Sequence, residues 1–390
     1  MKNNCKICGS TEQNKILNLC ENMKIMGKDF PESPSIIVEC PKCGLVYVEM
    51  EAKQEDFNLY YSSPSSNPLS YYELYKKENV LEYFNDILNS FKQYITADSK
   101  ILDSGGGCGE FAKFLIDKGY NNAEILDISP KCIEKSKEIG VNGILANCCE
   151  ANKELENKYD LIIMCHSLEH FMDIDKVILE AKKMLKENGY LYIELPDAEK
   201  YSDTGAVPFT MFTYEHLYHF TLDTMDNIAN AFGIKMVEKR AFKKADSYDV
   251  LYGLYQNNGK KKEVKYTDKT KKMILKYQEH SKNKLKPYID EFEKTQEKLI
   301  LWGVGASTAL LLNETFDNCN VIQLIDRNQQ RQGLKYKIKD KVFVVEEPSI
   351  INDDDATILI LPYWYHLSIM KQIQEMGFKN TIKSFQNKDN

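Results

Sequence analysis

The chain has 390 residues, which is enough for two or three domains. Its hydrophobic content of 43% and charged content of 28% are those of an ordinary globular protein. The formal charge of −7 argues against nucleic acid as a partner, because binding phosphates requires a basic surface.

Neither a membrane span nor export is expected. No apolar run in the sequence reaches the roughly 18 residues of a membrane-spanning helix, and the first residues lack the apolar stretch of a signal peptide. Eleven cysteines in a protein that is not exported indicate reduced thiols and metal ligands rather than disulfides. We therefore expect a cytoplasmic monomer or homodimer.

The first segment carries two cysteine pairs, Cys5-x-x-Cys8 and Cys40-x-x-Cys43. Two such pairs supply the four thiolates that Zn²⁺ binds in tetrahedral geometry. Because protein fills all four positions, the pattern predicts structural zinc and excludes a zinc hydrolase, which keeps one position for water.

Two segments link these pairs to the central part of the chain. Residues 57–64 place tyrosines beside serines and proline, which predicts an ordered loop rather than a helix or strand. Residues 71–94 have helical periodicity and few helix breakers, so they are expected to lead into the next domain.

The most informative stretch is 101–109, which reads ILDSGGGCG. A short apolar strand ends at Asp103, and the chain then turns through Gly105, Gly107 and Gly109 into a helix. Glycine adopts positive φ and leaves no Cβ between main chain and ligand, so a cofactor can lie against the turn. The spacing differs from the Gly-x-Gly-x-x-Gly of dinucleotide folds and resembles motif I of S-adenosylmethionine-dependent methyltransferases.

The residues that follow support this interpretation. Asp127 ends a second strand, 123–127, and its carboxylate can accept hydrogen bonds from ribose hydroxyls. A glycine cluster alone is equally a tight turn, but the order of Asp103, Asp127 and a strand over 159–164 favours the methyltransferase interpretation. Asn147 and Cys148 stand where such proteins hold the adenine, although Cys148 could instead be an ordinary buried thiol.

Strands and helices alternate over residues 100–257, which predicts a doubly wound α/β sheet closed by an antiparallel pair at 234–240 and 247–256. Residues 260–298 are charged and mostly helical in pattern, with a break expected at Pro287. The last segment begins with residues 299–307, which predict a second strand–glycine–helix unit. Because Thr308 occupies the place of the third fingerprint glycine, we expect a Rossmann-like substrate-gripping or packing domain rather than a second dinucleotide site.

The whole pattern resembles the sugar C-methyltransferases that act on nucleotide-linked deoxysugars. In that family a zinc-binding domain precedes an S-adenosylmethionine domain and a Rossmann-like C-terminal domain, which implies domains at 1–70, 71–258 and 259–390. The markers are the two cysteine pairs, residues 60–63, the turn over 103–109, the pair Glu215-His216, and residues 302–305 with 326–333. The family commonly has Tyr-His before the Glu-His pair. Here Thr213 and Tyr214 stand there, which leaves the substrate open.

The resemblance implies methyl transfer to a carbon next to a ketone. A histidine suits removal of the proton on that carbon, so His216 is predicted to be the general base. Glu215 would orient His216 or bind the sugar, and Tyr60 would donate to the enolate oxygen. A structural histidine is the alternative for His216, and His219 is a second candidate base.

His166 and His170 flank the end of the strand over 159–164, and the resemblance implies that they border the methionine end of the cofactor. His166 is also a weaker base candidate. Two other functions stay open. An O- or N-methyltransferase of a sugar or another small metabolite would use the same cofactor site without ionising a carbon acid. A non-catalytic, zinc-stabilised binding protein is disfavoured because the glycines and both aspartates are present.

Overall fold

The structure is a computed structural model that describes residues 4–20, 23–25, 28–30, 35–63, 78–203, 208–213, 215–243, 249–305, 308–329, 331–362 and 366–385. Several predicted features lie outside the described residues: the end of the predicted loop at Pro64, the start of the predicted helix at 71–77, and the first residues of the strand predicted over 247–256. Tyr214 is also outside them; it belongs to residues 197–221, which the sequence places as an insertion between a strand and the helix that starts near Leu222.

The N-terminal sheet has the order β1-β4-β5-β11 and is antiparallel throughout. Its first three strands are β1 (Asn14–Cys20), β4 (Ser35–Glu39) and β5 (Val46–Glu49), and β2 (Met23–Ile25) pairs with β3 (Lys28–Phe30) separately. The fourth strand, β11 (Tyr218–His219), comes from the insertion of the central domain and pairs with β5. The two regions are therefore joined by a shared sheet.

The central sheet has the order β12-β13-β10-β9-β6-β7-β8, in which β13 is antiparallel to both neighbours. This is the doubly wound sheet predicted for a class I methyltransferase domain. Its strands are β6 (Ile101–Ser104), β7 (Ala123–Asp127), β8 (Asn142–Leu145), β9 (Tyr159–Cys165), β10 (Leu185–Pro196), β12 (Lys235–Phe242) and β13 (Val250–Gln256). The helices of this part are α3 (Glu78–Phe91), α4 (Glu110–Asp117), α5 (Pro130–Glu138), α6 (Ile174–Met184) and α7 (Leu222–Phe232).

The middle of this sheet forms the core. Leu161, Ile162 and Ile163 on β9 are each 0% exposed, as expected for a parallel strand that is covered on both faces. Short 3₁₀ helices occur between the longer elements: η1 (Lys92–Tyr94) directly after α3, and, after strands, η2 (Lys153–Leu155), η3 (Leu168–His170), η4 (Ala198–Lys200) and η6 (Pro348–Ile350).

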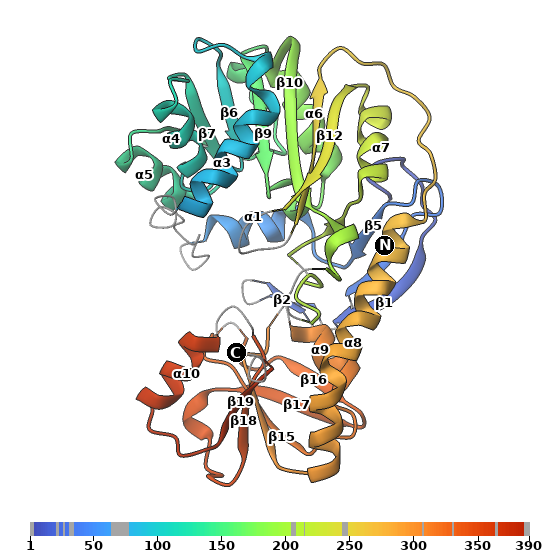
Figure 1. Cartoon of the computed structure of the whole chain (residues 1–390), viewed down its shortest axis with the longest axis vertical. Helices are drawn as coiled ribbons and strands as arrows, with labels where there is room; N and C mark the ends of the chain where they lie inside the picture. Colours follow the sequence, from blue (N-terminus) through green and yellow to red (C-terminus); the bar gives the residue numbers. More distant parts are fainter. Residues whose placement is uncertain are drawn as a thin grey trace.

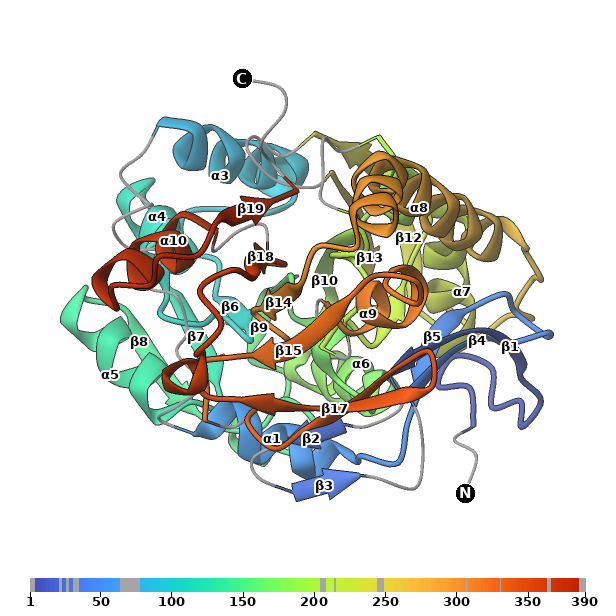
Figure 2. The same ribbon diagram turned by 90° about the horizontal axis from the view of Figure 1, so that it is seen from below.

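The C-terminal sheet has the order β16-β17-β15-β14-β18-β19 and confirms the Rossmann-like prediction. Its elements are β14 (Leu299–Trp302), α9 (Ala309–Thr315), β15 (Val321–Ile325), β16 (Lys335–Ile338), β17 (Lys341–Glu346), β18 (Thr357–Ile360), α10 (His366–Glu375) and β19 (Ile382–Ser384). The long helix α8 (Lys269–Thr295) connects this unit to the central one (Figure 1). Figure 2 shows the C-terminal unit from below, in front of the central sheet.

Two predicted elements differ from the structure. The expected loop over 57–64 is largely a helix, α1 (Gln54–Ser62). An Asp56 carboxylate oxygen accepts a hydrogen bond from the Lys53 backbone N–H at 2.9 Å, and Phe57 is only 1% exposed, so an end contact and burial stabilise a helix that composition alone does not indicate.

The break expected at Pro287 is absent, because α8 runs through this residue. Proline removes one backbone hydrogen bond, to the carbonyl of Asn283. Both residues lie on the exposed face of the helix, where water can satisfy that carbonyl. The buried stripe of Ser281, Leu285 and Ile289 holds the helix on the other face.

Candidate active site

A cavity of about 380 Å³ lies where α1 meets the carboxyl ends of the central strands. It is bounded by α1, by the glycine turn after β6, by the ends of β7, β8 and β9, and by the insertion. The lining residues are Gln54, Asn58, Tyr60, Tyr61, Gly105, Gly107, Asp127, Ile128, Ser129, Cys132, Asn147, Cys148, His166, Ser167, His170, Phe171 and Glu215. Figure 1 shows α1 beside the central domain, on the side that faces the C-terminal unit.

The glycine turn adopts the backbone that its sequence predicts. Gly105, Gly107 and Gly109 have φ values of +74°, +55° and +88°, a region that favours glycine. The Gly107 N–H donates to the Asp127 carboxylate at 3.0 Å, which ties the turn to the end of β7. A Cβ added at Gly105 would lie 2.8 Å from Cβ of Ser167, whereas one added at Gly107 would meet no protein atom within 4 Å. Gly107 therefore borders open space in the cavity.

The two predicted aspartates occupy different positions. Asp127 lines the cavity, and its carboxylate also accepts from the Ser129 N–H at 2.8 Å. Asp103 is 5% exposed, is not among the lining residues, and lies beneath the turn, close to Gly106. Burial, together with the charges of Asp127 and Glu110, raises the pKa of Asp103 to about 7. Asp103 thus supports the turn from below.

The predicted adenine region also reaches the cavity. Asn147 and Cys148 both line it, as do the apolar residues Ile128 and Phe171. The Cys148 thiol accepts a hydrogen bond from the Ser104 hydroxyl at 3.2 Å, and burial raises the pKa of this thiol to about 12. Cys148 is therefore a protonated, apolar wall group. Gly109, by contrast, is not a lining residue.

His166 lines the cavity at the end of β9 in a strained backbone conformation, with φ of +50°. Its Nε2 lies 3.1 Å from the Tyr83 hydroxyl and 3.2 Å from the carboxylate of Glu194, which is 0% exposed. Tyr83 also donates to Glu194, and so does Tyr192 at 2.8 Å. A buried network from α3 and β10 thus fixes this ring.

Another part of the cavity wall joins α1 to the insertion. The Tyr60 hydroxyl donates to the Glu215 carboxylate at 3.0 Å. The Tyr61 hydroxyl lies 3.1 Å from Nδ1 of His170, and this nitrogen is 2.8 Å from the backbone carbonyl of Glu215. Three predicted site residues, Tyr60, Glu215 and His170, are therefore brought together.

The remaining histidines of the insertion are not among the residues that line the cavity. His216 is not among the lining residues, and its ring centre is 5.1 Å from that of His170. Burial and the neighbouring His170 lower the pKa of His216 to about 3, which makes it a weak base. His219 is 0% exposed beside the Tyr201 hydroxyl, 3.2 Å away. The catalytic roles of both histidines stay predictions that the geometry does not favour.

Sequence reasoning missed several cavity and network residues. Gln54, Asn58 and Tyr61 occur at spacings of four and three, a helical signal that the loop prediction over 57–64 obscured. Tyr83 and Glu194 carry no motif and meet His166 only in three dimensions.

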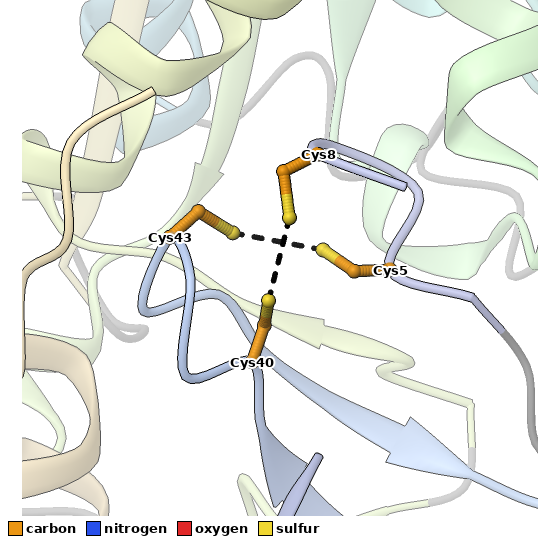
Figure 3. A group of neighbouring side chains, drawn as sticks. All are labelled: Cys5, Cys8, Cys40 and Cys43. Carbon is orange, nitrogen blue, oxygen red and sulfur yellow. Dashed lines mark hydrogen bonds between the residues drawn. The ribbon is translucent and has the colours of Figure 1, made fainter. Parts of the chain in front are cut away.

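The four predicted metal ligands converge (Figure 3). Sγ of Cys5 is 3.6 Å from Sγ of Cys43, and Sγ of Cys8 is 3.4 Å from Sγ of Cys40. Zinc–sulfur bonds of 2.3 Å in a tetrahedron place the sulfurs about 3.8 Å apart. The cluster therefore fits a zinc ion after a small expansion.

Comparison with known proteins agrees with the central fold. Residues 76–239 match the model of a family described as "Methyltransferase domain". The Ubiquinone biosynthesis O-methyltransferase of Pelagibacter ubique is 33% identical over 123 residues, which are 30% of this chain and 50% of that protein. The chain thus spans about half the length of the curated relative that it matches.

Solved structures with a similar fold include a 1,6-didemethyltoxoflavin-N1-methyltransferase from Burkholderia thailandensis with bound S-adenosylhomocysteine. It is 14% identical, with a TM-score of 0.42, and the match covers 61% of this chain and 99% of that one. A SAM-dependent methyltransferase from Archaeoglobus fulgidus is 17% identical, with a TM-score of 0.38 and coverage of 48% and 100%. The family match and the sheet order identify residues 76–239 as a methyltransferase domain. In the part of the chain that the structure describes, no helix combines the length and hydropathy needed to cross a bilayer.

Proposed function

We propose that the protein transfers the methyl group of S-adenosylmethionine to a small molecule, and that this acceptor is a nucleotide-linked sugar methylated on a carbon next to a ketone. One observation carries the proposal: a single cavity joins the glycine turn and Asp127 to the Tyr60–Glu215 pair. The cavity thus has a wall suited to a cofactor and a wall with groups that can handle a proton.

The cofactor wall fits S-adenosylmethionine. Gly107 leaves open space where a Cβ would otherwise stand, and the carboxylate of Asp127, which lines the cavity at the end of β7, would accept hydrogen bonds from ribose hydroxyls. Asn147 and Cys148 would border the adenine. When bound, the cofactor supplies an electrophilic methyl group, so the residues of this chain need only position the acceptor and move a proton.

On the acceptor wall we assign the base to Glu215 in preference to His216, because Glu215 lines the cavity and His216 does not. The Glu215 carboxylate would take the proton from the carbon beside the ketone. The Tyr60 hydroxyl, now hydrogen-bonded to Glu215, would donate to the oxygen on which negative charge develops.

The four-cysteine cluster would hold structural zinc, since all of its donors are thiolates. The cluster precedes α1 in the chain, and α1 supplies Tyr60 and Tyr61 to the cavity. Zinc would thus act on catalysis by fixing the position of this helix. The domain limits at 1–70, 71–258 and 259–390, a cytoplasmic location, and a monomeric or dimeric state remain part of the proposal.

An O-methyltransferase is the second candidate, because the Pelagibacter ubique relative bears that activity in its name. In that case Glu215 would deprotonate a hydroxyl instead of a carbon acid. An N-methyltransferase would need no strong base.

The deciding experiment incubates the full chain with methyl-labelled S-adenosylmethionine and a panel of nucleotide-linked keto- and amino-sugars, and locates the label by NMR. Carbon methylation predicts a new C–CH₃ group and deuterium exchange at the same carbon in heavy water before donor is added. Label on an oxygen or a nitrogen of the sugar would show that the protein is an O- or N-methyltransferase instead. Transfer to none of the sugars would overturn the substrate class, and no donor binding in calorimetry would overturn methyl transfer itself.

A further inference from the structure

A second cluster of metal-binding side chains adjoins the cavity. The short helix η3 places Glu169 and His170 next to each other after β9, and His216 of the insertion faces them. The ligand atoms of these three side chains lie within 4.8 Å of one another. None of them belongs to the cysteine cluster.

Glu169 is the unusual member of this cluster. It is 0% exposed, and neither carboxylate oxygen has a hydrogen-bond partner in the described part of the chain. Oε1 of Glu169 lies 3.6 Å from Nδ1 of His166 and 4.0 Å from Nε2 of His170, which is within ion-pair distance but beyond normal hydrogen-bond length. A buried carboxylate without hydrogen bonds is costly unless it is paired or coordinates a metal.

The hydrogen bonding of His170 sets the direction of its lone pair. Its Nδ1 is 2.8 Å from the Glu215 backbone carbonyl, which can only accept, so Nδ1 carries the proton. In the neutral ring, Nε2 then presents a lone pair toward Glu169. Histidines that bind metals usually have this arrangement, with the second ring nitrogen donating to a carbonyl or carboxylate.

We propose that Glu169, His170 and His216 bind a divalent first-row transition metal ion. Two donors about 2.1 Å from one ion can lie up to about 4.2 Å apart, which accommodates the 4.0 Å between Glu169 and His170 Nε2. Two imidazoles and one carboxylate suit Mn²⁺, Fe²⁺, Co²⁺ or Zn²⁺, and leave coordination positions for other ligands.

Because His170 lines the cavity, the open coordination positions of the ion would be accessible to a ligand bound in the cavity. A ligand with two neighbouring oxygens, such as a hydroxyl beside a ketone, could chelate the ion from the cavity. His216 would then serve the metal, and Glu215 would remain free to accept a proton. The binding inference does not rest on the proposed function, because it concerns the protein without donor or acceptor.

The test is a titration of the zinc-loaded full chain with Mn²⁺, followed by electron paramagnetic resonance. We expect one bound Mn²⁺ per chain, with pulsed spectra showing coupling to imidazole nitrogen. Glu169→Gln should weaken binding more than about 100-fold, since loss of an outer partner alone costs 10–100-fold. The matched control is Glu39→Gln, which changes another carboxylate with 0% exposure, far along the chain, and should bind Mn²⁺ like the wild type.

The inference is overturned if the wild-type chain binds no Mn²⁺, if the bound ion shows no nitrogen coupling, or if Glu169→Gln binds with unchanged affinity. Should Glu169→Gln fail to fold, His170→Asn and His216→Asn replace it, and unchanged binding by both has the same meaning. The nitrogen coupling is measured on the wild-type chain, so it tests for histidine coordination of Mn²⁺ even if no variant folds.

Discussion

Gly107 is the residue at which a single substitution tests cofactor binding most directly. It has positive φ and borders open space, so an added methyl group would enter the cavity rather than the protein core. Gly140 also has positive φ, at +81°, with no protein atom within 4 Å of an added Cβ, but it lies outside the cavity.

We therefore predict that Gly107→Ala and Gly140→Ala destabilise the fold by a similar amount, about 1 kcal/mol, while only Gly107→Ala abolishes binding of S-adenosylmethionine. Calorimetric titration and thermal unfolding measure the two effects separately. Equal affinity of the two variants for S-adenosylmethionine would show that the glycine turn is not part of the binding site.

Tyr60 is expected to act on the reaction and not on the cofactor. Tyr60→Phe removes the hydroxyl that contacts Glu215, so kcat should fall by about 10–100-fold, while donor affinity stays unchanged. Tyr266→Phe is the control, because its hydroxyl contacts Glu39 outside the cavity. A kcat for Tyr60→Phe equal to that of the control would contradict the assignment.

Asp103 makes stability depend on pH. Its pKa in the folded state, about 7, lies above the ordinary 3.8, so the folded protein holds a proton that the unfolded chain has released. Stability therefore falls as pH rises between these values, by at most about 1.4 kcal/mol per pH unit, and levels off above pH 7.

Asp103→Asn should flatten this fall, and its stability relative to the wild type should increase with pH across the same window. Urea unfolding at pH 5, 6, 7 and 8 measures the difference, with the exposed Asp98→Asn as control. A constant difference across these values would show that the buried carboxyl is not the source.

Sequence predicts a site residue when the position of its backbone at the end of a strand is enough to place it at the cavity. Gly105, Gly107 and Asp127 sit at strand ends, and the sheet order places them at the cavity. The position of His216 could not be predicted in this way. Neighbours in sequence, such as Glu215 and His216, face different surroundings in an irregular segment, and no periodicity says which of them lines the cavity.

At the scale of elements, sequence patterns predict the central strands but not helix α1. The strand over 123–127 was predicted with the limits that β7 shows, because its apolar residues are flanked by turn residues. Helix α1 was missed, because burial of Phe57 and an end contact at Asp56 outweigh a composition typical of loops.

Helix α1 also gives the cysteine cluster a measurable effect. If the cluster holds zinc as proposed, Cys43→Ser should remove the metal, lower the unfolding temperature and reduce methyl transfer, because the metal-binding region precedes α1, which carries Tyr60 and Tyr61. Zinc content, calorimetry and a rate assay check these three outcomes. Cys319→Ser, a free thiol of the C-terminal unit, should match the wild type. Full activity in a zinc-free Cys43→Ser protein would separate the cluster from catalysis.

At the scale of the whole molecule, the N-terminal region is bound to its neighbours by more than one contact. The carboxylate of Glu39, 0% exposed, accepts from the Tyr266 hydroxyl at 2.9 Å and from Lys271 at 3.0 Å. The Cys43 carbonyl accepts from Asn227 of α7 at 3.1 Å. Contacts between segments that lie far apart in the sequence leave no local periodic pattern. The sequence therefore predicts three successive units but not the hydrogen bonds that join the first of them to the others.

Deletion of residues 1–50 should therefore destabilise the central domain itself. It removes the strand that pairs with β11 and uncovers Tyr218, which is 5% exposed in the intact chain. We expect aggregation, or a broad thermal transition where the full chain gives a cooperative one. A shortened chain that unfolds as sharply as the intact protein would show that the central domain is autonomous.

The ladder between β5 and β11, where Tyr47 pairs with Tyr218, restricts how such a chain can be recombined. If two related sequences are joined at any point between these two tyrosines, the hybrid chain takes β5 from one parent and β11 from the other. Hybrids built from related proteins should therefore fold best when residues 215–220 and the N-terminal sheet come from the same parent, so an exchange of this cavity-lining segment has to include the strand that pairs with it.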